Sequence, residues 1–231
     1  MDTGQFHNYL QSHTDSFAKA IATDEGEWII KGFIDVYKRI YTISVDTKIV
    51  SKVLELLLFP MFEEFADAHN LAIELSPQQN FYPDLTFKHR PTGRLFAVDI
   101  KSTYRTSDNE VNGMTLGAFT GYFRHRNSNK NILYPYNQYA EHFVVGVIYS
   151  KCNKAADERK RFTIDNLSQI PSVIKEFQFL RSPNTVSLLL GPVAAIQRTL
   201  APSPRLTNLF KAKVHLPILG IRSMTIIGCS I

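Results

Sequence analysis

The chain has 231 residues, of which 44% are hydrophobic and 20% are charged, so it can bury the core of one globular domain. Its net charge of +5 suits a polyanionic partner, although charge alone identifies none. The longest apolar runs are too short to cross a bilayer, and the N-terminus lacks the pattern of a signal peptide. We therefore expect a cytoplasmic protein that does not interact with membranes.

The cysteines and the absence of repeats narrow the class further. Cys152 and Cys229 are far apart, and neither has a second Cys or His at zinc spacing, so a disulfide framework or a zinc site is not indicated. No repeat or linker divides the chain. We expect one domain over residues 1–231, with a catalytic core over about 45–180.

In chain order, the first predicted element is a helix over residues 47–70. Apolar residues recur there at helical spacing, as in Val50, Leu54 and Leu58, although Pro60 could kink or split the helix. Two short apolar runs follow, at 85–88 and 95–100, and the turn-forming Pro91-Thr92-Gly93 separates them, which predicts a β-hairpin. The apolar run 143–149 predicts a central strand covered on both faces. This order indicates a mixed α/β sheet.

The most informative pattern is Pro83-Asp84, fourteen intervening residues, and then Asp99-Ile100-Lys101. Side chains alternate along a strand, so Asp99 and Lys101 face the same side while Ile100 faces the core. The hairpin has about the length needed to bring Asp84 beside Asp99. Two carboxylates that meet can bind a hard divalent cation such as Mg²⁺, and a lysine beside them can orient or deprotonate a water and stabilise charge on a phosphate. The pattern predicts phosphodiester hydrolysis.

An ordinary structural interpretation of the same residues exists, in which the aspartates end a turn and a strand and the lysine is solvated. Val98 and Ile100 argue against it, because a charge inside an apolar strand is costly unless it is paired or bound to metal. Glu55, in the apolar helix segment, is either a surface glutamate or a further carboxylate that reaches the metal centre.

Several strings resemble the EcoRV-type restriction endonucleases of the PD-(D/E)xK nuclease superfamily. They are VDTKIVSKVLELLLFP, QQNFYPDLTF, FAVDIKSTY, TLGAFTGYFR and KNILYPYNQYAEHFVVGVIY, in that order between Asp46 and Ser150. The resemblance implies an α/β fold with a restriction-endonuclease-like core, a central mixed β-sheet flanked by helices. It implies metal binding by Asp84, Asp99 and Glu55, and Lys101 as the catalytic lysine. It fades before about Ser44, in the segment that helps to build the dimer interface in that family.

The resemblance also assigns DNA contacts. Gln78, Gln79 and Asn80 correspond to a glutamine-rich loop that approaches the minor groove, although a polar surface turn is the ordinary interpretation of such residues. Further hydroxyls and cations in the matching segments are expected to contact phosphates. They are Thr47, Lys48, Ser102, Thr103 and Lys130.

The resemblance stops near Leu180, where the family has a polar recognition loop. Residues 181–231 contain no acidic residue and are rich in apolar residues. Read one frame away, with permitted codons, Val193 to Ala201 can encode GSNTENIG and Gly220 to Cys229 can encode DKVYDDYWM, both close to family segments. We therefore hypothesise a frameshift near Leu180 and Arg181, which would leave this tail without the recognition loop.

Together these observations predict a Mg²⁺-dependent type II restriction endonuclease. It would cut both strands of double-stranded DNA at a short palindrome as a homodimer, with blunt ends, and a DNA methyltransferase gene would be its genetic neighbour. Two alternatives remain open. One is an inactive DNA-binding remnant with a frameshifted C-terminus, and the other is a DNA-repair nuclease with the same core.

Overall fold

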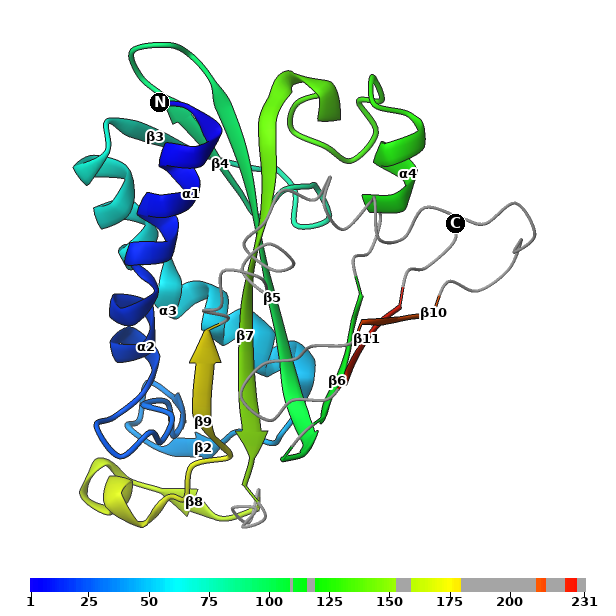
Figure 1. Ribbon diagram of the computed structural model, residues 1–231. Helices are drawn as coiled ribbons and strands as arrows, with labels where there is room; N and C mark the ends of the chain where they lie inside the picture. Colours follow the sequence, from blue (N-terminus) through cyan, green and yellow to red (C-terminus); the bar gives the residue numbers. More distant parts are fainter. Residues whose placement is uncertain (109, 116–118, 153–158, 180–210, 215–222, 228–231) are drawn as a thin grey trace.

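The computed structural model describes residues 1–108, 110–115, 119–152, 159–179, 211–214 and 223–227. Its centre is a mixed eight-stranded sheet in which β5 has three strand neighbours, β4, β6 and β7 (Figure 1). Helices α1, α2 and α3 lie together on one side of this sheet (Figure 1). The predicted α/β architecture with a central mixed sheet and flanking helices is confirmed.

Two short helices, which the sequence analysis did not predict, open the chain. Helix α1 spans Thr3–Ser12 and α2 spans Thr14–Ile21. Asp2 caps α1 reciprocally with Gln5, since each side chain accepts a hydrogen bond from the other residue's backbone N–H. Phe6 and Leu10 are fully buried and hold α1 against the sheet.

Helix α3 runs without interruption over Thr47–Ala68, so the helix predicted over residues 47–70 is confirmed and Pro60 does not split it. Asp46 caps its first turn by accepting hydrogen bonds from the N–H groups of Lys48 and Ile49. Pro60 has no N–H to donate to the Leu56 carbonyl one turn earlier, but both residues lie on the exposed side of α3, where water can satisfy that carbonyl.

The central sheet contains the predicted hairpin. Strand β4 (Leu85–His89) pairs antiparallel with β5 (Leu95–Ser107) on one edge and with β3 (Leu71–Leu75) on the other. Gly93 provides the positive φ of 68° in the turn between β4 and β5. The hairpin is confirmed, but β5 is longer than the predicted run because its far end pairs with β6 (Glu110–Thr115).

Strand β7 (Tyr139–Lys151) is the predicted central strand. It pairs parallel with β5 and antiparallel with β9 (Ile174–Phe179), and residues 143–149 are all buried, as the apolar run predicted. Alternate residues of β5 and β7, such as Val98, Ile100, Val145 and Val147, join the apolar cluster under α1, α2 and α3. The opposite face of β5 is therefore free to carry polar groups.

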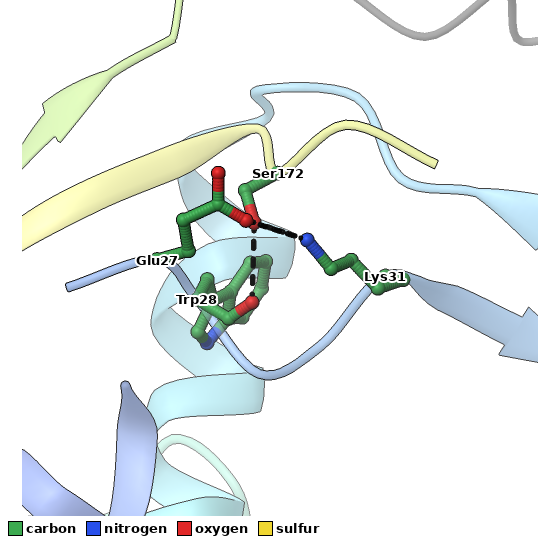
Figure 2. A network of polar contacts seen from close by, with 4 residues as sticks. All are labelled: Glu27, Trp28, Lys31 and Ser172. Carbon is green, nitrogen blue, oxygen red and sulfur yellow. Dashed lines mark hydrogen bonds and ion pairs between the residues drawn. The ribbon is translucent and has the colours of Figure 1, made fainter. Parts of the chain in front are cut away.

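A second, three-stranded sheet lies at one end of the molecule. Its order is β1 (Gly32–Ile34), β2 (Ile40–Thr42) and β8 (Arg161–Phe162). Figure 2 shows the polar contacts of the segment that leads into β1. The hydroxyl of Ser172, which is buried, donates to the Trp28 carbonyl and accepts a hydrogen bond from Lys31, and Lys31 also forms an ion pair with Glu27 (Figure 2). These contacts join the segment before β1 to the segment before β9.

The remaining elements are short. They are α4 (Phe119–Arg124), the 3-10 helices η1 (Tyr136–Gln138) and η2 (Ile164–Gln169), and the strands β10 (Lys211–Val214) and β11 (Ser223–Ile227). Strand β11 pairs parallel with β6. The segment 193–201 and half of 220–229 lie outside the described residues, so the structure does not test the frameshift hypothesis there.

In the part of the chain that the structure describes, no helix combines the length and the apolar character needed to span a membrane.

Candidate active site

The hairpin of β4 and β5 brings Asp84 and Asp99 together. In its antiparallel register Leu85 is opposite Val98, so the next residue outward on each strand is an aspartate. One carboxylate oxygen of Asp84 accepts a hydrogen bond from the Ile100 backbone N–H at 2.7 Å. This bond fixes the Asp84 carboxylate against β5, and the predicted meeting of the two aspartates is present.

Strand alternation places Lys101 beside Asp99. Ile100 belongs to the apolar core under the helices, while Asp99 and Lys101 face the other side of the sheet, as the sequence predicted. The Lys101 ammonium forms an ion pair with Asp99 Oδ2, and Asp99 is only 4% exposed. The positive charge is therefore held next to the paired carboxyl groups.

Burial dominates the electrostatics of this group. It raises the pKa of Asp99 to about 7, since Lys101 lowers it only in part and Asp84 raises it again. Burial alone would lower the pKa of Lys101, but attraction to Asp99 and Asp84 outweighs it and the pKa is raised. The negative charge of Asp84 is thus one cause of the raised pKa of Asp99, and a divalent cation beside both carboxyl groups would offset that repulsion.

Glu55 lies on α3, across from the aspartates. Its carboxylate forms an ion pair with Lys52 at 2.8 Å. Glu55 contributes to the raised pKa of Lys101, so it shares the same electrostatic environment. Among the described residues, however, no three His, Cys, Asp or Glu side chains come together as a ready metal cluster, and Glu55 is not gathered with Asp84 and Asp99.

A cleft of about 350 Å³ lies between α3 and the segment that leads into β4. Asp84 and Glu55 both line it, so the Asp84 carboxylate opens into a hollow rather than onto a flat surface. The other lining residues are Lys48, Ser51, Lys52, Leu75, Ser76, Gln78, Gln79, Phe81 and Pro83.

The predicted DNA contacts fall into groups. Lys48, Gln78 and Gln79 line the cleft, and Thr47 and Asn80 are exposed beside these residues in the chain. Lys130 is exposed on the loop between α4 and β7.

Ser102 and Thr103 are engaged within the protein. The hydroxyl of Ser102 pairs with that of Ser51 at 2.7 Å. Thr103 is buried, and its hydroxyl donates to the Asn112 carbonyl on β6. Because β5 continues past the predicted strand end, the Thr103 hydroxyl is bonded to β6, and its contact with a phosphate stays a prediction.

Sequence reasoning missed Ser51 and Lys52, although a signal for them exists. Lys48, Ser51, Lys52 and Glu55 are spaced i, i+3, i+4 and i+7, which places them on one face of α3, and that face lines the cleft. Three charged residues and a serine on one face of an apolar helix mark a side turned away from the core.

The donor set fits a hard divalent cation. Asp99 presents a buried carboxyl oxygen whose partner is the Lys101 ammonium, and Asp84 has one oxygen left after its bond to Ile100. Magnesium usually takes one or two protein carboxylates and keeps several waters, so two aspartates beside an open cleft suffice. Manganese and calcium also accept such oxygen ligands.

Comparison with known proteins decides the family. The family model described as "Restriction endonuclease EcoRV" matches residues 24–185. The chain belongs to the EcoRV family of restriction endonucleases. It is 32% identical over 197 residues to the type II restriction enzyme EcoRV of Escherichia coli, which covers 85% of this chain and 76% of that protein.

The extent of the match corrects the sequence analysis at both ends. The EcoRV family match begins at residue 24, so it includes β1 and β2, where the resemblance was expected to have faded before Ser44. It ends at residue 185, close to the expected limit near Leu180. The alignment to the Escherichia coli enzyme spans 197 residues and so must extend beyond Leu180.

Proposed function

We propose that this protein is a type II restriction endonuclease that hydrolyses phosphodiester bonds in both strands of a short palindromic DNA site and leaves blunt ends. The observation that carries the proposal is the group of Asp84, Asp99 and Lys101, of which Asp84 lines a cleft, in a chain of the EcoRV family. Membership of that family supports DNA cleavage and dependence on a divalent cation.

Asp84 and Asp99 would hold the cation, which we propose is Mg²⁺. When bound, Mg²⁺ supplies Lewis acidity and lowers the pKa of coordinated water. Glu55 adds negative charge from the α3 side of the cleft, and its ion pair with Lys52 would have to open before its carboxylate could bind a metal. We therefore assign Glu55 as a third, conditional ligand.

Lys101 acts on the phosphate and on the attacking water. Its ammonium lies beside Asp99, so it is positioned where charge develops on the phosphate oxygens during the reaction. The ion pair fixes the ammonium without consuming all three of its N–H donors, so one donor can orient a water. Asp99 thus positions Lys101 as well as the cation.

The cleft residues position the DNA. Lys48 and Thr47 lie in the first turn of α3, where the Lys48 ammonium and the Thr47 hydroxyl can contact a phosphate. Gln78, Gln79 and Asn80 present amides beside the same cleft and suit groove edges and sugars. Exposed Lys130 adds a phosphate contact, and Ser102 contributes through its hydroxyl bond to Ser51.

A homodimer supplies the second active site. One chain carries one group of Asp84, Asp99 and Lys101, and a twofold dimer presents one such group to each strand of a palindrome. The β1 and β2 hairpin exposes apolar side chains, including Ile34 at 58%, Val36 at 90% and Tyr37 at 74%. A second copy of this chain would cover them.

Digestion of a DNA of known sequence tests the proposal. We expect cleavage only with a divalent cation, at one palindrome, with blunt ends when the cut positions are mapped. Cleavage of branched or random DNA would instead favour a repair nuclease, and binding without cleavage would favour an inactive remnant. A DNA methyltransferase gene beside this one, with a product that protects the same site, would support restriction.

A further inference from the structure

A buried hydrogen-bond chain lies directly behind Asp84. Tyr82 precedes Asp84 by two residues, and its hydroxyl meets His142 Nδ1 on β7 at 2.7 Å. The other ring nitrogen of His142, Nε2, meets the Tyr136 carbonyl at 3.0 Å. Tyr82 is 7% exposed and His142 is 3% exposed, so water does not compete for these bonds.

The partners fix the direction of each bond. A carbonyl oxygen only accepts, so His142 Nε2 carries the proton. Burial lowers the pKa of His142 to about 4, so the ring is neutral near pH 7 and Nδ1 is an acceptor. The Tyr82 hydroxyl therefore donates to His142. The ring of Tyr136 stacks on that of His142, with centroids 3.7 Å apart, and holds its plane.

These hydrogen bonds pass over one strand of the sheet. Strand β5 lies between β4 and β7, and Ala97 of β5 is opposite both Thr86 on β4 and His142 on β7. A methyl group at this buried position leaves room above β5, so side chains from the β4 side can reach β7. Thr86 uses the same space, and its hydroxyl meets the Tyr139 hydroxyl at 3.0 Å.

Asp84 is thus held from both sides. Tyr82 lies two residues before Asp84 and Thr86 two residues after it. The side chain of each is hydrogen-bonded to a residue of β7. The backbone of Tyr82 is also fixed, because its N–H donates to the Asn131 carbonyl and its carbonyl accepts from the Leu133 N–H, both at 2.9 Å.

We propose that Tyr82 and His142 are positioning residues that hold the Asp84 carboxylate against Asp99 in the geometry a divalent cation needs. The inference rests on the proposed function of Asp84. Neither residue touches the cation or the DNA in this assignment. They fix the position of Asp84, the proposed metal ligand. Loss of residues that orient a metal ligand typically weakens metal binding by about 10- to 100-fold.

Replacing Tyr82 by Phe removes only the hydroxyl and leaves His142 Nδ1 without a donor. We expect the Mg²⁺ concentration for half-maximal single-turnover cleavage to rise about 10-fold or more. Affinity for DNA without metal should be unchanged, and high Mg²⁺ should restore much of the rate. Calorimetric titration with Ca²⁺ should show a matching loss of affinity independently of cleavage.

Tyr149→Phe is the matched control, because Tyr149 is a fully buried tyrosine of β7 on the face turned toward the helices. It should lower thermal stability without changing either metal measurement. A double variant, Tyr82→Phe with His142→Phe, should cost no more metal affinity than the worse single variant, since both single variants break the same Tyr82–His142 bond.

The outcomes separate the two proposals. If the wild-type protein cleaves no DNA with any divalent cation, the proposed function is wrong, and the Ca²⁺ titration still decides the positioning role. If the wild type cleaves and Tyr82→Phe keeps the wild-type Mg²⁺ and Ca²⁺ dependence, the positioning role alone is overturned. Should His142→Phe fail to fold, the Tyr82→Phe variant gives the answer by itself.

Discussion

Asp99 and Lys101 show how single side chains set the chemistry of this site. Asp99 is almost fully buried and Lys101 largely so, and burial of charge is costly unless the charges are paired. Their ion pair offsets that cost, while Asp84 adds a second negative group that the pair does not neutralise. The group carries one negative charge more than it balances when both carboxyls are ionised, which favours a cation.

Asp84→Ala and Asp99→Ala test the ligands. Each change removes one of two carboxylates that would hold the cation, so we expect cleavage to fall by at least about 1,000-fold and Ca²⁺ binding to be lost. Circular dichroism should show a retained fold. Asp67→Ala, on the exposed side of α3, is the control and should cut normally. Cutting at the wild-type rate by either site variant would remove the ligand assignment.

Lys101→Ala separates chemistry from binding. It deletes the charge beside the scissile phosphate without removing a metal ligand, so DNA and Ca²⁺ should still bind while single-turnover cleavage slows by about 100-fold or more. Lys88→Ala, which breaks only the ion pair with Glu74, should leave cleavage unchanged. A loss of DNA affinity with an unchanged single-turnover rate would make Lys101 a phosphate anchor instead.

His142 predicts a pH effect on stability. Its pKa is about 4 in the folded protein against 6.5 for an unperturbed histidine. Above pH 6.5 both states are neutral, but between pH 6.5 and about 4 the unfolded chain binds a proton that the folded protein does not. Stability should therefore fall with pH across this window, by up to about 3 kcal/mol.

Urea unfolding of the metal-free protein at several pH values measures that effect. His142→Phe should lose less stability than the wild type between pH 7 and pH 4.5. His125→Ala, at an exposed position, should follow the wild-type curve. Parallel curves for wild type and His142→Phe would show that His142 does not stay neutral in the folded protein.

Among the structural elements, sequence periodicity predicted those with a continuous apolar pattern. Helix α3, the β4 and β5 hairpin and the buried strand β7 follow directly from the spacing of their apolar residues. Strands β1, β2 and β8 are too short for any period to emerge, and only their pairing defines them. The capping pair of Asp2 and Gln5 is a local signal that could have found α1.

In the candidate site, too, some residues could be predicted from the sequence and others could not. Asp84, Asp99 and Lys101 were predictable because strand alternation and one hairpin register fix their positions. The surroundings of Thr103 were not predictable, because they depend on β6, a partner that the local sequence does not specify. Tyr82 and His142 are 60 residues apart in the chain, and no local pattern joins them. Long-range pairing is the information that the sequence alone lacks.

The β1 and β2 hairpin is the element on which dimerisation should depend. The Asp35 carboxylate holds its turn by accepting bonds from the N–H groups of Tyr37 and Arg39. Ile34→Asp places a charge in the proposed interface, and burying one such apolar side chain contributes about 1.5–3 kcal/mol. In a twofold dimer the substitution is present in both protomers and its cost applies twice. We therefore expect the dimer to weaken by at least about 100-fold.

Sedimentation at several protein concentrations measures the dimer, with metal and DNA absent. Leu56→Asp, at an exposed apolar position on α3, is the control and should sediment as the wild type does. If Ile34→Asp leaves the dimer intact, the chains meet through another surface. A wild-type protein that remains monomeric at all concentrations would contradict the homodimer itself.

Across the whole molecule, the sequence changes character beyond the end of the family match. Residues 24–185 match the EcoRV family model, whereas residues 181–231 contain no acidic residue, although the alignment to the Escherichia coli enzyme extends past Leu180. Reading bases in the major groove needs placed donors and acceptors, and a sequence rich in Leu, Val, Ala and Pro supplies few. Under the frameshift hypothesis this chain therefore keeps the catalytic residues but lacks the loop that reads the bases.

The nucleotide sequence and a frame-restored gene test that hypothesis together. If the shifted frame beyond Leu180 is open and encodes GSNTENIG and DKVYDDYWM, we expect the restored protein to cut one defined palindrome with Mg²⁺. The 231-residue chain as it stands should bind DNA weakly through phosphate contacts, with an affinity that falls steeply between 50 and 200 mM salt, and should cut little specifically. An early stop codon in the shifted frame would show that the frameshift hypothesis is wrong. Efficient site-specific cleavage by the 231-residue chain would also contradict it, and would show that the chain's own tail is a recognition element.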